Sequence, residues 1–458
     1  MIRKFKYLHA VVFLSPLILL HSFLLLRLSF FPYPELFVYP YLAENGFLPY
    51  TQILDQHFPS LLMFPLNLYD FGLRSAFSGR IFLIGIVTLS HIFLYLVAKK
   101  LLKSEKKAVV ANLLYFLLQP LFEGTTLWLD SFLVPILLAA LYFSLKFIED
   151  KRNLYLALSG LFLGLALFLK QVILPLVIAI TIYFYYKNKD LSKIFLFLFF
   201  ALFPLTLTIA WVYSKGIFND FFYWTVTFNF EVYAKMGRKL PNLSQLARVL
   251  IFWTPAFYWI YSKFRRKEIA LLGIFMIFSL ATAFSRFEFV HLQPSLAFAV
   301  LLITVFLSKG KEKLKFLYIL VMLSVIGVWS VRFYSQNWGG ATYFFDEETI
   351  KVAQKVTELS GPNEKIFVLG AQPIIYYLAD RLPAGKIFSV SVPWNMRVAQ
   401  ETILNGLKED KPKVVVRDDA ASIDQVKVVD FTKSLNEYIN EFYVKVGEVG
   451  PTEILVLR

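Results

Sequence analysis

Residues 33–59 form a polar loop between two long apolar segments and contain Glu35, Asp55, Gln56 and His57, with Tyr50 between them. A carboxylate can accept a proton from an attacking group, and an imidazole can donate a hydrogen bond to a phosphate. Polar chemistry beside a membrane span is a functional-site hypothesis by default. The plainer alternative is that Glu35 is an ordinary solvated loop acid.

A second set of ionisable and polar side chains lies at the ends of later apolar segments. They are Glu123 and Asp130 in FEGTTLWLD, Lys170 and Gln171 in LKQ, and Arg286, Glu288 and His291 in RFEFVHLQP. If these ends are neighbours, we expect Glu35, Lys170 and Arg286 to converge in one outward cavity that holds an acid and two cations. The alternatives are that the cations anchor helix ends by snorkelling and that Asp130 caps a helix or pairs across helices.

The composition predicts that these side chains are positioned by membrane helices. The chain has 458 residues, of which 58% are hydrophobic and 18% aromatic, and its mean hydropathy is +0.60. Such a chain is too apolar for a soluble enzyme. Mostly apolar runs long enough to cross a bilayer occur at residues 9–31, 80–98, 108–122, 125–147, 154–170, 172–186, 193–213, 248–262, 269–285, 288–307 and 315–333. We therefore expect about eleven transmembrane helices, with ten or twelve as alternatives.

Loop charges predict the orientation, because cytoplasmic loops accumulate Lys and Arg. The amino-terminal segment and alternate loops, such as 99–107 and 263–267, are rich in basic residues, whereas the short loops between them are poor in them. The amino terminus is therefore expected in the cytoplasm, and the carboxy-terminal domain and the polar loops outside, in a multi-pass plasma-membrane protein. This asymmetry also accounts for the net charge of +15, so we expect no nucleic-acid partner. The chain contains no cysteine, which excludes disulfides.

The remaining chain predicts a second domain. We expect a transmembrane domain at 1–333 with external loops 32–79 and 214–247, a linker at 334–343, and a small α/β domain at 344–458, because helical and strand patterns alternate there. The aromatic stretch in loop 214–247 could shape a groove for a lipid tail or simply form an aromatic belt. His9, His21 and His91 are expected to pack or bond within the helix bundle.

The loop pattern PE-x5-Y-x4-G-x2-PY-x4-DQH-x-P, together with LKQ at 169–171 and RFEFVHLQP at 286–294, resembles the GT-C superfamily of membrane glycosyltransferases. The most similar group is that of the protein O-mannosyltransferases and aminoarabinose transferases, also described as family 39 or RgtA-like. The resemblance covers most of residues 1–333 and implies a GT-C-like helical membrane fold.

The resemblance implies transfer of a sugar from a polyprenyl-phosphate donor to a hydroxyl or amine of a protein, lipid or glycan acceptor. The expected reaction is an inverting single displacement with Glu35 as base and Asp55 as a second catalytic carboxylate. The candidates for donor phosphate binding are Lys170, Arg286, His57 and His291. Supporting roles are expected for Gln56, Tyr50, Glu123, Asp130, Gln171 and Glu288.

No cofactor is certain from the sequence. A divalent metal held by Asp55, His57 and His291 is an open alternative, although their spacing is not a recognised ligand motif. A ligase or polymerase of lipid-linked glycans and a transporter or flippase of lipid-linked sugars are the competing functions. A transporter is expected to place its polar residues near the bilayer midplane, whereas the residues here lie at the outer ends of the spans.

Overall fold

The computed structural model describes residues 2–263 and 265–458, and it describes side chains from residue 13 onward. The basic side chains of the amino-terminal segment and the His9 side chain, on which predictions were made, lie outside the described side chains. The chain forms two compact units. The first comprises residues 1–31, 79–208 and 239–341, and the second comprises residues 32–78, 209–238 and 342–458.

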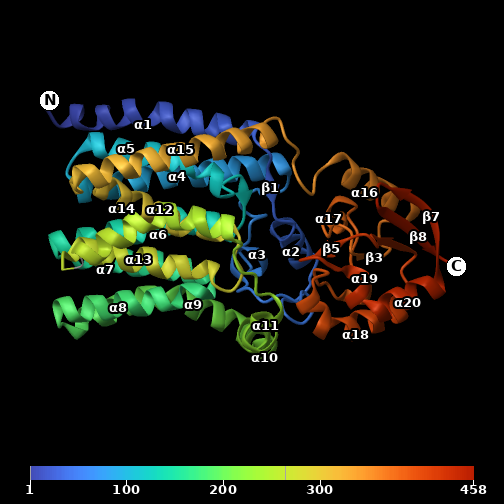
Figure 1. The fold of residues 1–458 in the computed structure, drawn as a ribbon. Coiled ribbons are helices and arrows are strands. Elements are labelled where there is room, and N and C mark those ends of the chain that lie inside the picture. The colour runs from blue at the N-terminus through green and yellow to red at the C-terminus, as the bar shows by residue number, and fades with distance from the viewer. Residues whose placement is uncertain (1, 264) are drawn as a thin grey trace. The chain divides into compact units, whose positions relative to one another are not determined.

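The first unit is built from long helices that run side by side (Figure 1). They are α1 (Ile2–Arg27), α4 (Ala76–Leu102), α5 (Glu105–Leu118), α6 (Leu129–Asp150), α7 (Asn153–Leu169), α8 (Leu174–Asn188), α9 (Leu191–Ser214), α12 (Leu243–Lys263), α13 (Lys267–Leu280), α14 (Gln293–Lys309) and α15 (Glu312–Asn337). Each predicted span corresponds to one of these helices, although the boundaries differ by several residues. Of the described residues, five helices are by themselves long and apolar enough to cross a membrane: α4, α6, α9, α15 and residues 289–309, which include α14.

The core of this unit is centred on α14, which packs against α5, α6, α12 and α13. Its residues 293–306 are all buried. Two glycines of α7 allow a close approach to α9, because a Cβ at Gly160 would lie 2.5 Å from the carbonyl oxygen of Phe197 and one at Gly164 would lie 2.5 Å from that of Ala201. Small residues at such positions are the usual means by which membrane helices pack closely.

A buried polar network joins α1, α4 and α5. His21 Nδ1 lies 2.9 Å from His91 Nε2, and His91 Nδ1 lies 2.8 Å from the side-chain oxygen of Asn112. His21 Nε2 lies 3.0 Å from Oε1 of Gln119, and Gln293 donates to the carbonyl oxygen of Gln119 at 3.1 Å. The structure thus confirms that His21 and His91 bond within the bundle, where a buried polar group without a partner would be costly.

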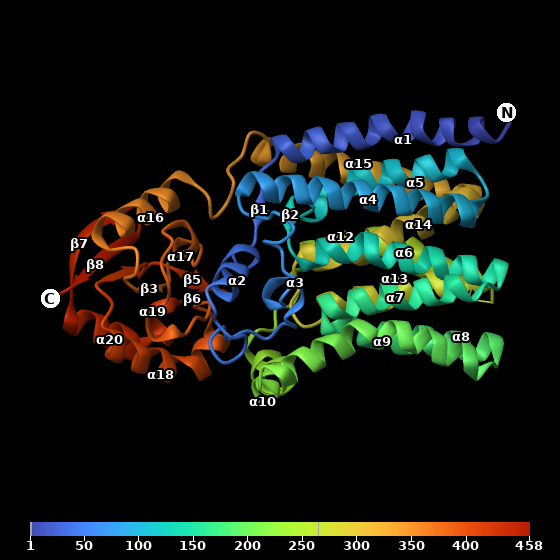
Figure 2. The same ribbon diagram turned by 180° about the vertical axis from the view of Figure 1, so that it is seen from behind.

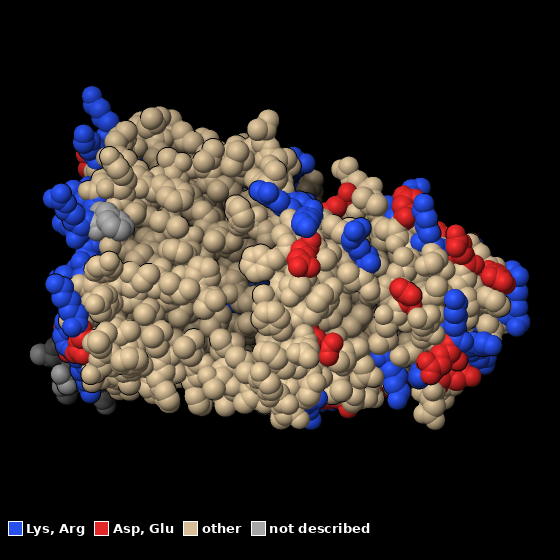
Figure 3. Space-filling model, turned by 90° about the horizontal axis from the view of Figure 1, so that it is seen from below, with Lys and Arg blue, Asp and Glu red and all other residues tan. Residues whose placement is uncertain are grey.

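On the face shown in Figure 3, Lys and Arg side chains gather at one end of the helical unit, and the flank beside them is largely free of charge. The turns between α4 and α5, α6 and α7, α8 and α9, and α14 and α15 lie at this end (Figure 1). Basic residues end α4 and α14, namely Lys99, Lys100 and Lys309. This distribution agrees with the alternation of basic and non-basic loops in the sequence.

The second unit contains a four-stranded sheet in the order β3-β4-β8-β7. Strand β3 (Ile366–Leu369) is parallel to β4 (Val414–Arg417), and β8 (Thr452–Leu457) is antiparallel to both β4 and β7 (Tyr443–Val449). Helix α16 (Glu347–Leu359) lies on one side of this sheet, and α18 (Pro393–Asp410) and α20 (Lys433–Phe442) lie on the other (Figure 2). The helices and strands expected after residue 344 are therefore present.

The same unit takes in segments that the sequence interpretation assigned to the membrane domain. They form α2 (Glu35–Glu44), α3 (Ser60–Met63), α10 (Phe218–Phe222), the π-helices η3 (Tyr223–Thr227) and η4 (Asn229–Tyr233), and α11 (Ala234–Met236). Phe388 is joined to the first loop by two backbone hydrogen bonds, one to the Gln52 carbonyl and one from the Leu54 amide. Helix α15 continues to Asn337, and Gly339 is the first residue beyond it with a positive φ. The linker at 334–343 stays a prediction.

Candidate functional site

Asp55 is held by its own loop and by α2. Its Oδ1 accepts hydrogen bonds from the backbone amide of His57 at 2.7 Å and from the His57 ring Nδ1 at 2.8 Å. Its Oδ2 accepts the hydroxyl proton of Tyr39 at 2.7 Å. Burial alone would raise the pKa of Asp55, but the attraction of His57 and these hydrogen bonds hold it below the ordinary value. Asp55 is therefore an ionised carboxylate in a nearly closed environment.

Glu35 is the first residue of α2, and its carboxyl group lies in the electrostatic field of Asp55 and His57. Its Oε2 atom is buried and has no hydrogen-bond partner among the described residues. Burial raises the pKa of Glu35 to about 7, and repulsion from Asp55 contributes in the same direction. Two carboxylates whose pKa values are shifted apart are the usual basis for separate acid and base roles. Glu35 can exchange a proton near neutral pH while Asp55 stays charged.

The two other predicted residues of this loop have structural contacts. The Tyr50 hydroxyl donates to the His57 carbonyl oxygen at 2.9 Å, and Tyr50 has a positive φ of 68°. The Gln56 carbonyl accepts a hydrogen bond from the Asn229 side chain at 3.1 Å. Tyr50 and Asn229 therefore fix the backbone carbonyls of His57 and Gln56, within the segment that carries Asp55 and His57.

Asp130 lies in the first turn of α6 and is fully buried. Its Oδ2 accepts from Lys170 Nζ at 2.7 Å and lies 2.9 Å from His291 Nδ1. Lys170 follows the last residue of α7, and His291 lies in the short helix η6 (Phe289–Leu292). The second oxygen, Asp130 Oδ1, is buried without a hydrogen-bond partner among the described residues. Three segments that are distant in sequence thus meet at one buried carboxylate.

Arg286 and Glu288 extend this cluster along the chain. Arg286 Nε donates to Glu288 Oε1 at 2.9 Å, and Glu288 Oε2 lies 3.9 Å from His291 Nε2. Lys239 Nζ lies 3.7 Å from the same Glu288 Oε1, and the Lys239 carbonyl accepts from the Phe287 amide. The predicted phosphate-binding residues Lys170, Arg286 and His291 therefore lie in one connected charged cluster, and each is already paired with a carboxylate.

The predicted residues are thus divided between the two units. Lys170 and Arg286 belong to the first unit, whereas Glu35 belongs to the second with Asp55 and His57. Each group is connected within its own unit by the hydrogen bonds and ion pairs described above. The convergence of Glu35, Lys170 and Arg286 in one cavity stays a prediction.

The remaining predicted residues lie around the Asp130 cluster. Glu123 has a left-handed backbone with φ of 56°, and its Oε2 accepts from the Val290 amide at 3.0 Å. This bond fixes the segment that carries Glu288 and His291. Gln171 begins the short helix η2 (Gln171–Ile173) directly after Lys170.

The described residues contain no group of three or more His, Cys, Asp or Glu side chains that could hold a metal ion. The open alternative of a metal held by Asp55, His57 and His291 gains no support from this arrangement. His291 Nδ1 is engaged with Asp130, and His57 Nδ1 is engaged with Asp55. The other ring nitrogen of His291, Nε2, lies 3.9 Å from Glu288 Oε2.

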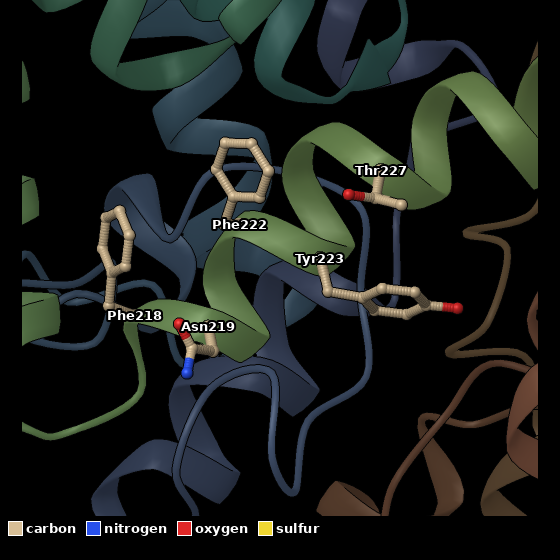
Figure 4. A pocket seen from close by; sticks show the side chains of 5 residues that line it. All are labelled: Phe218, Asn219, Phe222, Tyr223 and Thr227. Carbon is tan, nitrogen blue, oxygen red and sulfur yellow. The ribbon is translucent and has the colours of Figure 1, made fainter.

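A shallow aromatic pocket of about 280 Å³ lies on α10 and η3. Figure 4 shows the side chains that line it, projecting from successive turns of residues 218–227. They are Phe218, Asn219, Phe222, Tyr223 and Thr227. π-Helical turns such as η3 occur frequently at functional sites. The pocket lies in the loop from which a lipid-tail groove was expected.

Sequence reasoning missed Tyr39, Asn229 and Lys239. Tyr39 lies among apolar residues of α2, and nothing in its local pattern indicates that its hydroxyl reaches Asp55. Asn229 and Lys239 lie in a loop whose aromatic content dominated the interpretation. The signal that could have found Tyr39 is its spacing of four residues from Glu35 on one helix, which places both side chains on the same face.

The fold and part of the sequence are similar to those of known proteins. The model of the family described as Dolichyl-phosphate-mannose-protein mannosyltransferase matches residues 67–213. No curated protein sequence matches the chain. Among solved structures, the chain is similar to ArnT from Cupriavidus metallidurans bound to undecaprenyl phosphate, with a TM-score of 0.67, 11% sequence identity and 98% of each chain covered.

A second similar structure is the archaeal oligosaccharyltransferase AglB from Archaeoglobus fulgidus, in complex with an inhibitory peptide and a dolichol-phosphate. It has a TM-score of 0.54 and 14% identity, over 90% of this chain and 70% of that chain. The family match and the shared fold confirm the similarity to GT-C membrane glycosyltransferases that the sequence motifs indicated. At these identities the solved structures show a shared fold, and the family model matches residues 67–213.

Proposed function

We propose that the protein transfers a sugar from a polyprenyl-phosphate donor to a hydroxyl or amine of an acceptor on the extracytoplasmic side of the membrane. The observation that carries this proposal is the Glu35 carboxyl group, whose Oε2 is buried without a partner among the described residues and whose pKa is raised to about 7 beside the ionised Asp55. A group of this kind is suited to general-base catalysis near neutral pH, because its pKa lies close to the pH at which it works.

The proposed reaction is a single inverting displacement. Glu35 takes the proton from the acceptor O–H or N–H as that atom attacks the anomeric carbon of the sugar. The bond between the anomeric carbon and the phosphate oxygen breaks, and its electron pair leaves with the polyprenyl phosphate. Asp55 remains charged and orients His57 through two hydrogen bonds. The His57 Nε2 atom then donates to a phosphate oxygen.

The cluster around Asp130 supports a role in binding the donor phosphate. Negative charge accumulates on the leaving phosphate, and fixed cations stabilise it best where little water is present. Lys170 is buried with only 8% of its side chain exposed, and the Arg286 side chain is 15% exposed. Asp130 and Glu288 hold these cations in place, so little reorganisation is needed when a phosphate arrives. Arg286 is the principal candidate, because its guanidinium can bind two phosphate oxygens at once.

The orientation is supported by the distribution of basic residues. Lys and Arg gather at one end of the helical unit (Figure 3), and such clusters favour the cytoplasmic side. Under this orientation, Glu123, Asp130, Lys170 and His291 belong to the extracytoplasmic end. The proposal also places the α/β domain on that side, with a role in covering the site or binding the acceptor. The aromatic pocket on α10 and η3 would then contact the lipid tail of the donor.

The experiment is transfer of radiolabelled sugar from polyprenyl-phosphate hexoses, by purified protein with a membrane extract as the source of acceptor. We expect the wild-type protein to consume the donor and Glu35→Gln to lose this activity while it remains folded. Glu437→Gln, an exposed acid on α20 of the same unit, is the matched control and should be active. Equal turnover by Glu35→Gln and wild type would remove Glu35 from the catalytic role.

The acceptor product separates the competing functions. A transferase moves one sugar residue, whereas a ligase or polymerase of lipid-linked glycans moves a preassembled chain and gives a product of correspondingly larger mass. A transporter or flippase would move the donor across a vesicle membrane without breaking the bond to phosphate. Mass spectrometry of the product and a donor-translocation assay in liposomes therefore distinguish the three.

A further inference from the structure

A second pocket, of about 400 Å³, lies in the second unit between α2, residues 69–74 and the short helix α17 (Ile375–Leu378). We call it the tyrosine pocket. Its lining residues are Tyr41, Glu44, Asn45, Tyr69, Arg74, Tyr377, Leu378 and Asp380. Its volume is within the range of small-molecule sites, which combine aromatic walls with a few polar groups. None of these residues takes part in the reaction proposed above.

Three tyrosine rings form the wall of this pocket. The ring centroid of Tyr377 lies 5.8 Å from that of Tyr41 and 5.9 Å from that of Tyr69, with the rings of each pair tilted or edge-on. The Tyr377 hydroxyl donates to the Arg74 carbonyl at 2.6 Å, and the Tyr41 hydroxyl donates to Asp380 Oδ1 at 3.0 Å. These bonds link α2, the segment after α3 and α17, so the wall is built before any ligand binds.

The polar side chains of the pocket carry planar groups, and their contacts within the protein leave them able to form further hydrogen bonds with a ligand. Asp380 engages Oδ1 with Tyr41, and Arg74 lies over the Tyr69 ring with 5.0 Å between its Cζ and the ring centroid. Arg74 also pairs with Glu44 at 3.4 Å, but both side chains are solvent-exposed, so this pair is weak and can be replaced by a ligand. Carboxylates, an amide and a guanidinium on one concave surface match the paired hydroxyls of a sugar ring.

The Tyr69 hydroxyl provides an independent indication of a ligand. Tyr69 is 4% exposed, and its buried hydroxyl interacts with the hydroxyl of Tyr377 but forms no hydrogen bond of normal geometry among the described residues. A buried hydroxyl whose hydrogen bonds are poorly formed costs free energy, and Tyr69 lines the pocket. A ligand hydroxyl that enters the pocket would supply a hydrogen bond of good geometry.

We infer that the tyrosine pocket binds an uncharged saccharide unit of the acceptor. This inference rests on the proposed sugar transfer for its biological meaning, but the binding itself does not depend on it. The C–H face of a pyranose ring packs on the tyrosine rings, and its hydroxyls bond to Tyr69, Asp380, Arg74 and Glu44. Two carboxylates against one guanidinium give the pocket a net negative charge, which disfavours phosphates and acidic sugars.

The test is saturation-transfer NMR and titration of the purified full-length protein with methyl glycosides of mannose, glucose, galactose and N-acetylglucosamine, without any lipid donor. We expect at least one of these to bind, and the methyl glycoside of glucuronic acid not to bind. The informative variant is Tyr69→Phe, which removes only a hydroxyl without a well-formed hydrogen bond among the described residues and so should leave folding intact. We expect it to weaken binding about three- to tenfold, the usual effect of one lost hydrogen bond.

Asp380→Asn should weaken binding to a similar degree, because it removes the charged acceptor while it preserves the size of the side chain. Tyr443→Phe is the control: this hydroxyl bonds to the Pro412 carbonyl at 2.9 Å, outside the pocket, and binding should be unchanged. The inference is overturned if no methyl glycoside binds, or if binding is the same in Tyr69→Phe and Asp380→Asn as in the wild type. Loss of transfer in Glu35→Gln with intact glycoside binding would separate the two proposals, because the titration uses no donor.

Discussion

Asp55 receives two hydrogen bonds from a single residue, His57, one from its backbone amide at 2.7 Å and one from its ring Nδ1 at 2.8 Å. The double contact fixes both the loop and the imidazole, and it leaves Nε2 as the ring nitrogen that is not bonded to Asp55. A third bond, from the Tyr39 hydroxyl, completes the environment of the carboxylate. The pair therefore acts as one positioned unit beside Glu35.

Asp55→Asn tests this unit. Replacing the carboxylate removes the charge that orients His57, and we expect sugar transfer to fall roughly ten- to hundredfold, as for a lost charged hydrogen bond. Because Asp55 also repels the Glu35 carboxylate, the pH midpoint of the remaining activity should move to lower pH. A purely structural role for Asp55 would lower activity without moving this midpoint. Initial rates from pH 5 to 9 measure both effects.

The activity itself should depend on the ionisation of Glu35. The proposed base works only when deprotonated, and its pKa is raised to about 7. We therefore expect kcat/KM to rise with pH and to level off above about 7. Glu35→Asp keeps a carboxylate on a shorter side chain, so it should retain a rising profile at a lower rate. A flat profile between pH 5.5 and 8 in the wild type would contradict the assignment.

Folding stability should follow the opposite trend with pH. The folded-state pKa of Glu35, about 7, lies above the ordinary value of 4.5, so the folded protein holds this proton more tightly than the unfolded chain. The resulting stabilisation, on the order of 3 kcal/mol in total, is fully present below about pH 4.5, declines as the pH rises from 4.5 to 7, and is lost above about pH 7. Glu35→Gln should remove this dependence. The measurement is thermal unfolding in detergent at pH 5 and pH 8. We expect the melting temperature of Glu35→Gln, relative to that of the wild type at the same pH, to be raised more at pH 8 than at pH 5.

The buried pair of Asp130 and Lys170 should be required for stability. Asp130→Asn leaves the Lys170 ammonium without a full counter-charge in a buried environment, at a cost of about 3–5 kcal/mol. Asp150→Asn provides a matched control on the same helix: it breaks a partly exposed pair with Lys146 at 3.3 Å and should cost less than about 1 kcal/mol. Thermal unfolding of both variants measures these two losses of stability. Equal small losses would show that Asp130 does not form the buried ion pair.

Arg286→Lys tests phosphate binding. Lysine keeps the charge but loses the planar fork, so we expect KM for the polyprenyl-phosphate donor to rise about tenfold with a smaller change in kcat. Arg332→Lys, on the exposed side of α15, should leave KM unchanged. If Arg286→Lys changes only the melting temperature, Arg286 serves the ion pair with Glu288 and does not contact the donor.

The sequence alone indicated a resemblance to membrane glycosyltransferases and the approximate location of the helices. Apolar runs and basic loops are local properties, because each span must satisfy its own backbone hydrogen bonds and its own length requirement. For the same reason the helices and strands after residue 344 were recognisable. Glu35, Asp55 and His57 could be identified because short motifs place them in one loop.

The tertiary structure decided which side chains meet. Nothing in the local sequence indicates that Asp130, Lys170 and His291 share one carboxylate, since α6, α7 and η6 are brought together only by packing of the bundle. The same holds for the Tyr39 bond to Asp55 and for the tyrosine pocket, whose walls come from segments about three hundred residues apart. Burial shifts the pKa of Glu35, and burial is a property of the assembled unit that residue type and spacing do not specify.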